Sequence, residues 1–538
     1  MTTGGPAADV ATERDQAYQA LRAAMPPSNM QAALRCSAKL QDALPDPGRL
    51  DRNLVMVAYG GGKDSSYTLA FVRAMQLILF RVYGSTFRLR VATNRHAGMP
   101  RAVLENMDRE YQALRLTADP GCELLLIDGP EVSVFDVNTP QREHVVRRNR
   151  LDILMTGHRT FADGRPTFCN ACNLSVMNSF GLGAAYGDGA DLIITGDSQQ
   201  EQREYAVWVS RLARRLAPLS SGAKGRGAKA GAAKSLGAEG GGTKGSGLGG
   251  FLSHVDRIAQ SYFTDIYGED AVDTIAERRV TSEVPERLRF FSIYSDTAYT
   301  ARDHLELLTG FLGFKFDDLA FSFTESDCGN PALMAHLRGL KCERVFQRPY
   351  AEGLEEYVKF ALGLMRKKDF PAELIEQMRQ RYAGPDAADQ MRRVAGRYAL
   401  ETFGLTEEQL VCMAYSPFAD KGAGLEDYLA REQPSLATRA AGVHALLASD
   451  PGSDDDRGSA GGLGPAGGLP PLAADLERIS GLELKQLRVL YRSPVRQLNG
   501  RGGTEVIDAV LVGDPHKAVI HTRHAPDGPD TLEQISGR

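Results

Sequence analysis

Short apolar segments alternate with amphipathic segments along residues 54–296 of the chain. Apolar runs bounded by turn-forming residues predict strands, whereas apolar residues spaced three and four apart predict helices. The predicted strands are residues 54–59, 87–94, 122–128, 191–197 and 289–296, and the predicted helices between them are residues 65–82, 101–116, 140–155 and 173–187. Near-continuous apolar strands separated by helices are typical of a parallel sheet with helices on both faces. The pattern therefore predicts an α/β fold built on a five-stranded, doubly wound parallel sheet.

The rest of the chain departs from this alternation. Residues 11–44 and 350–432 have helical spacing, and EVIDAVLVGDPHKAVIHTR (505–523) predicts a hairpin. Residues 220–250 are rich in Gly and Lys and contain too few apolar side chains to offset the entropy of ordering, so we expect a disordered insertion. The predicted organisation is an N-terminal helical segment (1–50), a main domain (51–345), a helical extension (346–448), a Gly/Pro-rich linker (449–471) and a small C-terminal segment (472–538).

The overall composition is that of a globular protein. The chain has 538 residues, more than one ordinary core holds, with 43% hydrophobic and 24% charged residues. No apolar run approaches the ~18 residues of a membrane span, and the N-terminus lacks the pattern of a secretory signal. Seven cysteines, an odd number, favour reduced thiols or metal ligands over a disulfide framework. We therefore expect a cytoplasmic protein without a membrane partner, and the net charge of −5 gives no general attraction to nucleic acid.

The segment LVMVAYGGGKDSS (54–66) joins the first predicted strand to a helix through three glycines. A P-loop would need Gly at position 57 and Ser or Thr at position 64, where this chain has Val57 and Asp64. The glycine spacing of a dinucleotide fingerprint is also absent. What remains is a turn whose backbone amides can approach an anion at a helix N-terminus. Lys63 adds a cation, Asp64 suits a bridging Mg²⁺, and the next two serines add donors, although a plain strand-to-helix turn with capping residues would share these features.

The sequence GGGKDSS (60–66) resembles the pyrophosphate loop, S-G-G-K-D-S, of the N-type ATP pyrophosphatases, with Gly60 in place of the first Ser. This family is also called the PP-loop or adenine nucleotide α-hydrolase-like superfamily, and the resemblance covers residues 50–345. It implies the HUP-type fold of that superfamily and cleavage of ATP between its α and β phosphates. A substrate oxygen would be adenylated, and a nucleophile that carries sulfur or nitrogen would then displace AMP.

A second signature of the superfamily is similar to LIITGDSQQEQ (192–202), where the strand ends at the nucleotide edge. By the same resemblance, the end of the second strand would line the adenine pocket, while His96 is expected to lie exposed in a loop. The residues that the resemblance implies around ATP and Mg²⁺ are Ala58, Tyr59, Gly60, Gly61, Gly62, Lys63, Asp64, Ser65, Ser66, Thr93, Asn94, Thr195, Gly196 and Asp197. Among these, Lys63, Asp64 and Ser65 are expected to be catalytic.

FCNACN (168–173) places Cys169 and Cys172 immediately before a predicted helix. Such a pair can be half of a zinc site, a redox pair or two inert thiols. The order of motifs resembles the tRNA 2-thiocytidine synthetase branch of the superfamily, which uses a third cysteine downstream. Cys328 would be that third thiolate, and three thiolates would leave one position open on a [4Fe–4S] cluster. A Zn²⁺ site closed by a fourth ligand such as Cys342 is the alternative.

The resemblance implies ATP-dependent thiolation of a tRNA, a nucleobase or a small-molecule carbonyl, with sulfide or a sulfur-donor protein as the partner. One alternative is a PP-loop amidotransferase or amide ligase that uses a nitrogen nucleophile and has a structural zinc site. Another alternative is a nucleotide- or metal-sensing regulatory protein with a catalytically silent PP-loop. The sequence does not decide between a monomer and a homodimer. The resemblance to the thiocytidine enzymes does not cover residues 350–538.

Overall fold

The computed structural model describes most of the chain. The described residues are 6–196, 248–293, 305–316, 319, 328–367, 370, 372–449, 471–496, 505–514 and 516–537. Almost all of the insertion predicted at 220–250 and of the linker predicted at 449–471 lies outside them. The chain forms two compact units that alternate along the sequence. The first unit comprises Met1–Arg142, Cys172–Ala259 and Arg279–Gly329, and the second comprises Glu143–Ala171, Gln260–Arg278 and Asn330–Arg538.

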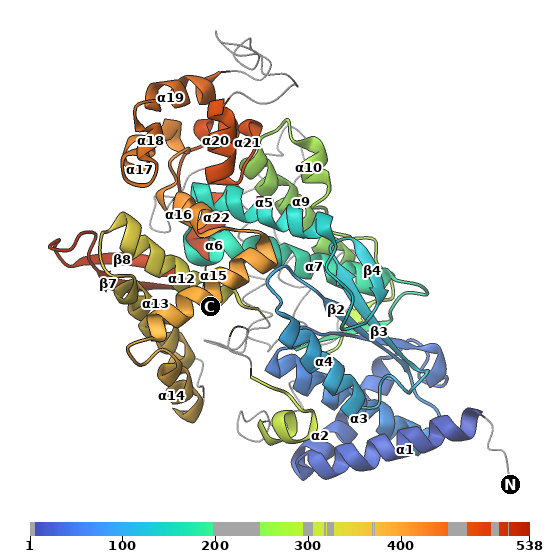
Figure 1. Ribbon diagram of the computed structural model, residues 1–538. Helices are drawn as coiled ribbons and strands as arrows, with labels where there is room; N and C mark the ends of the chain where they lie inside the picture. The colour runs from blue at the N-terminus through green and yellow to red at the C-terminus, as the bar shows by residue number, and fades with distance from the viewer. Residues whose placement is uncertain are drawn as a thin grey trace. The chain divides into compact units, whose positions relative to one another are not determined.

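A six-stranded sheet lies in the first unit (Figure 1). Its strands are β1 (Leu54–Ala58), β2 (Arg88–Asn94), β3 (Cys122–Asp128), β4 (Glu131–Val134), β5 (Leu192–Thr195) and β6 (Arg289–Phe290). Their order is β4-β3-β2-β1-β5-β6, and all neighbours are parallel except β3 and β4. The predicted α/β class with a mostly parallel sheet is confirmed. The sheet has one strand more than the five predicted, because β4 is a short, partly exposed segment without an apolar run.

The helices of the first unit pack on the sheet or on one another. They include α1 (Pro6–Ala24), α2 (Pro27–Ala43), α3 (Lys63–Tyr83), α4 (Arg101–Ala113) and α7 (Asn170–Ala185), with α1 and α2 beside α3 in Figure 1. Val55 and Val57 of β1 belong to the core that includes α3 and α4. Met56, between them, faces α7, where Gly183 comes close to its sulfur atom. Because side chains of a strand alternate between faces, α3 and α7 lie on opposite sides of β1.

The second unit is mostly helical. Its helices include α5 (Glu143–Arg159), α12 (Asn330–Leu340), α13 (Tyr350–Lys367), α15 (Ala387–Phe403), α16 (Glu407–Tyr415), α21 (Leu484–Arg492) and α22 (Val506–Gly513). The helical character predicted for residues 350–432 is confirmed. A hairpin is present, but it pairs β7 (Lys517–Thr522) with the later strand β8 (Thr531–Ser536). No helix in the described part of the chain has the length and apolarity needed to cross a membrane.

The hairpin predicted over residues 505–523 is therefore wrong in its first half, which forms α22. The segment is rich in β-branched residues, and this favours a strand by local propensity alone. However, Glu505 and Asp508 form a capping box, with the Glu505 amide donating to Asp508 Oδ2 at 3.2 Å. Most of the apolar side chains of the helix are also buried. Capping and burial together outweigh the local preference for a strand.

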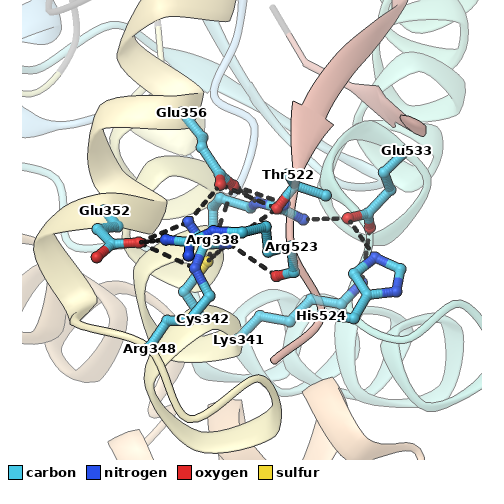
Figure 2. A network of polar contacts seen from close by, with 10 residues as sticks. All are labelled: Arg338, Lys341, Cys342, Arg348, Glu352, Glu356, Thr522, Arg523, His524 and Glu533. Atoms are coloured by element: carbon cyan, nitrogen blue, oxygen red, sulfur yellow. Dashed lines mark hydrogen bonds and ion pairs between the residues drawn. The ribbon is translucent and has the colours of Figure 1, made fainter. Parts of the chain in front are cut away.

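A buried ionic network joins the hairpin to α12 and α13 (Figure 2). Arg338 of α12 donates to Glu356 at 2.7 Å and to Glu533 of β8 at 2.8 Å. Arg348 donates to the same Glu356 at 2.9 Å and to Thr522 of β7 at 3.0 Å. The two arginines are only 6% and 7% exposed. Since a buried charge is tolerated only when it is paired, the network fixes the hairpin on these helices.

Candidate functional site

The order of the strands reverses direction at β1. The chain places β2 and β3 on one side of β1 and then returns to place β5 on the other side. Ala58, the last residue of β1, pairs with Ala92 of β2 and with Thr195 of β5, so the carboxyl ends of the three strands meet at one edge. In open α/β sheets, ligands bind outside the carboxyl ends of the strands at the point where the order reverses. This edge is therefore the candidate site.

The glycine turn of residues 60–62 lies at this edge, between β1 and α3. Gly61 has a φ of +75°, a conformation that residues with a side chain rarely adopt. A Cβ atom at this position would lie 2.3 Å from Met107 Cε and 2.8 Å from Val103 Cγ1, both on α4. Glycine is needed here for two reasons: the left-handed backbone and the close approach of α4.

The first turn of α3 carries the polar groups predicted to bind an anion. Gly62 is the N-cap, and no side chain caps the helix. The hydroxyls of Ser65 and Ser66 donate to the Gly62 carbonyl at 2.9 and 3.0 Å. Lys63 Nζ lies 3.8 Å from Asp64 Oδ1, and the two side chains are 11% and 36% exposed. The positive end of a helix, an ammonium group and a partly exposed carboxylate therefore lie within one helical turn.

Strand β5 brings the second predicted motif to the same edge. Thr195 is the last residue of the strand and is buried. A Cβ atom on Gly196 would lie 3.0 Å from Ser65 Cα and 3.1 Å from its amide nitrogen. The end of β5 therefore packs directly against the first turn of α3. Asp197, the third residue of the motif, lies outside the described residues.

The end of β2 presents two side chains on opposite faces of the sheet. Thr93 is fully buried, and its Oγ1 lies 3.2 Å from the Tyr111 hydroxyl on α4. Asn94 accepts a hydrogen bond from Ser175 of α7 at 3.2 Å. Its Nδ2 is buried without a hydrogen-bond partner among the described residues. The expectation that His96 is exposed is wrong, because the backbone turns back at the sheet edge and leaves this side chain only 3% exposed.

A buried carboxyl group that the sequence analysis did not identify lies behind the turn. Glu110 of α4 is fully buried, with Tyr59 donating a hydrogen bond to Oε2 and the Ser66 hydroxyl 2.9 Å from Oε1. Burial raises the pKa of Glu110 to about 8, against the lowering effect of these hydrogen bonds and of a nearby arginine. The signal in the sequence is that Glu110 shares one helix face with the apolar Val103 and Met107.

Two of the predicted metal ligands lie in the first unit, near the end of β2 or the loop that follows it. Cys172 is partly buried and lies one turn of α7 before the serine that contacts Asn94. Cys328 is 1% exposed, and the amide of the residue that follows it donates to the Gly98 carbonyl at 2.9 Å. Contacts of neighbouring residues therefore place Cys172 near the end of β2 and Cys328 near the loop that follows it.

The other two cysteines of the predicted sites lie in the second unit. Cys169 is buried and directly follows α6 (Gly164–Phe168). Cys342 is buried in the ionic network, with its sulfur 3.8 Å from Glu356 Oε2, and burial raises its pKa to about 11. Among the residues that the structure describes, no three His, Cys, Asp or Glu side chains are grouped to hold a metal ion.

Comparison of the chain with protein-family models, with curated proteins and with solved structures gives no match. The resemblance to the PP-loop enzymes therefore depends on the residues of the glycine turn and the Thr-Gly motif. In the structure, the glycine turn and the Thr-Gly motif are adjacent at one edge of the sheet.

Proposed function

We propose that the protein is an AMP-forming ATP pyrophosphatase of the PP-loop type, which adenylates a substrate and then transfers sulfur to it. The main support for the proposal is the position of the glycine turn. It lies directly after β1, where the strand order reverses, and Gly196 packs on Ser65 beside it. Glycine backbone, a helix N-terminus and a lysine are the groups that proteins use to bind polyphosphate. The sheet would then contain the five-stranded, doubly wound core of the PP-loop fold.

In this proposal, the turn and the first residues of α3 bind the two terminal phosphates of ATP. The groups that would hold them are the amides of Gly60, Gly61 and Gly62 and the side chains of Lys63 and Ser65. These donors would stabilise the negative charge that develops on the departing pyrophosphate. Electrostatic stabilisation of this kind is commonly the largest single contribution to catalysis. Asn94 would recognise adenine, because its buried amide nitrogen has two protons to donate and no partner among the described residues.

Asp64 is suited to hold a divalent cation beside the phosphates. Its carboxylate is partly exposed next to the turn, and Mg²⁺ is usually bound by one or two carboxylates together with substrate phosphates. The bound cation would neutralise phosphate charge. Without it, the Asp64 carboxylate would repel the anion that the rest of the turn attracts.

The proposal is tested by identifying the products that form from ATP in the presence of candidate carbonyl acceptors. We expect AMP and pyrophosphate in the wild type, and at least about a 100-fold loss of pyrophosphate formation in Lys63→Ala and in Asp64→Asn. The matched control is Lys359→Ala, which removes a lysine that is 73% exposed on α13 and should leave turnover unchanged. Formation of ADP and orthophosphate, or full turnover in the Lys63 variant, would refute the proposal.

Metal analysis separates sulfur transfer from nitrogen transfer. After anaerobic purification, iron and acid-labile sulfide are expected in the wild type and lost in Cys172→Ala and Cys328→Ala, while ATP binding is retained. Stoichiometric zinc without sulfide would instead favour an amide ligase with the same adenylation step. Tight ATP binding without turnover on any acceptor would point to a regulatory protein.

A further inference from the structure

We propose that Glu110 is a positioning residue of the anion-binding turn and that it acts as a neutral carboxylic acid. The inference rests on the proposed function, since it concerns how the turn binds the phosphates of ATP. Glu110 contacts the hydroxyls of Tyr59 and Ser66. Tyr59 directly precedes the three glycines, and Ser66 lies in the first turn of α3. The Glu110 side chain therefore links the residue before the glycines to the first turn of α3 through hydrogen bonds.

The hydrogen bonds that form around Ser66 depend on whether Glu110 is neutral or ionised. The Ser66 hydroxyl lies 2.9 Å from Glu110 Oε1 and 3.0 Å from the Gly62 carbonyl oxygen, but it has only one proton to donate. A protonated Glu110 donates to Ser66, which then donates to Gly62, while Tyr59 donates to the other carboxyl oxygen. An ionised Glu110 competes with Gly62 for the Ser66 proton. With a neutral Glu110 the Ser66 hydroxyl keeps its hydrogen bond to Gly62, whereas with an ionised Glu110 the Gly62 carbonyl accepts only from the Ser66 amide and the Ser65 hydroxyl.

The rest of α4 supports the turn from the same side. Val103, Met107 and Glu110 follow one another along one face of the helix. The first two side chains pack against Gly61, so closely that a Cβ atom on this glycine would overlap them. The helix also binds a second backbone segment, because Asn106 donates to the Lys315 carbonyl at 2.9 Å. The carboxyl group therefore belongs to a rigid, fully packed support, and its position relative to the turn is fixed.

The charge of Glu110 should then be coupled to anion binding. A carboxylate fixed behind the turn would repel bound phosphate, so phosphate and the neutral acid favour each other. The titratable groups that face Glu110 are Tyr59, Arg109 and Tyr111, and burial raises the pKa of both tyrosines. Glu110 is therefore the group in this cluster that changes charge near pH 8. The affinity for ATP should be high below that pH and fall above it.

The experiment compares MgATP binding by calorimetry in the wild type and in Glu110→Gln between pH 6.5 and 10. A glutamine amide imitates the neutral acid, because its nitrogen can donate to Ser66 and its oxygen can accept from Tyr59. We expect equal affinities within about threefold at pH 7. By pH 10 the wild type should have lost at least about tenfold in affinity relative to the variant, since one unit of pKa coupling is tenfold. The ratio of the two curves cancels the titration of the nucleotide and every other pH effect that the two proteins share.

A second variant covers the case in which Glu110→Gln does not fold. Tyr59→Phe removes a donor that stabilises the carboxylate, so the fall in affinity should move to higher pH. Parallel pH profiles in the wild type and Glu110→Gln, or an unmoved midpoint in Tyr59→Phe, would overturn the role of Glu110 and leave the proposed function standing. Absence of ATP binding at every pH would overturn both.

Discussion

At the scale of single residues, the glycine turn depends on side chains that lie behind it as much as on its own glycines. The left-handed φ of Gly61 and the approach of Val103 and Met107 explain why a side chain at the second glycine would be strained. The contacts of Glu110 explain how the ends of the turn are held. A loop without side chains of its own gains rigidity from its support, and under the proposed function such rigid donors would cost little ordering entropy when ATP binds.

Gly61→Ala tests this dependence on close packing. The substitution combines a left-handed φ with overlap of α4 side chains, so we expect the free energy of unfolding to fall by about 2–3 kcal/mol, with weakened ATP binding. The control is Gly84→Ala at the end of α3, where φ is +69° and the space is open. That variant should lose only about 1 kcal/mol and bind ATP normally. Equal losses of stability in the two variants by chemical denaturation would contradict the packing argument.

At the scale of elements, the second unit shows how distant segments are joined through charge. Arg338 of α12 and Arg348 lie between α13 and the C-terminal hairpin, and both depend on Glu356 for compensation. Hydrophobic patterning predicted the helices here, because their apolar faces repeat along the sequence. The partners of the arginines lie up to 195 residues away, and no local pattern encodes such a pairing.

Glu356→Gln should therefore destabilise the second unit strongly. Removing one partner leaves two buried guanidinium groups undercompensated, and we expect a loss of about 3–5 kcal/mol in the free energy of unfolding. The matched control is Glu355→Gln on the same helix, whose carboxylate pairs with Lys359 at the surface, with side chains 64% and 73% exposed. That change should cost less than about 1 kcal/mol. Similar losses in the two variants would show that the network contributes no more than a surface ion pair.

At the scale of the whole molecule, the two units are not consecutive along the chain. Residues 143–171 and 260–278 belong to the second unit although they lie within the sequence of the first. Their partners come from the far C-terminus: Arg159 donates to Glu505 at 2.9 Å, and Asp265 accepts from the Val506 amide at 2.6 Å. The extension beyond residue 345 therefore completes a fold that the preceding sequence begins.

A chain that ends at residue 345 should show this dependence. It retains the sequence of the sheet but removes most packing partners of α5, which contacts α15, α16 and α21. We expect tryptic cleavage within residues 143–159 to be at least about tenfold faster than in the full chain, because local opening exposes the backbone. Mass spectrometry of the first fragments identifies the sites. Equal protection in the shortened and full chains would show that these segments do not need the C-terminal partners.

The sequence by itself determined the α/β class, five of the strands, the helices between them and the place of the glycine turn between the first strand and its helix. Strand and helix periods and turn residues are local, so they can be recognised without knowledge of the fold. Only the tertiary structure decided that β5 lies beside β1 with Gly196 on Ser65, that Val506–Gly513 is a helix, and that Glu110 lies behind the turn. These features depend on contacts between residues far apart in the chain, and a buried carboxyl group is recognised only when its partners are in place.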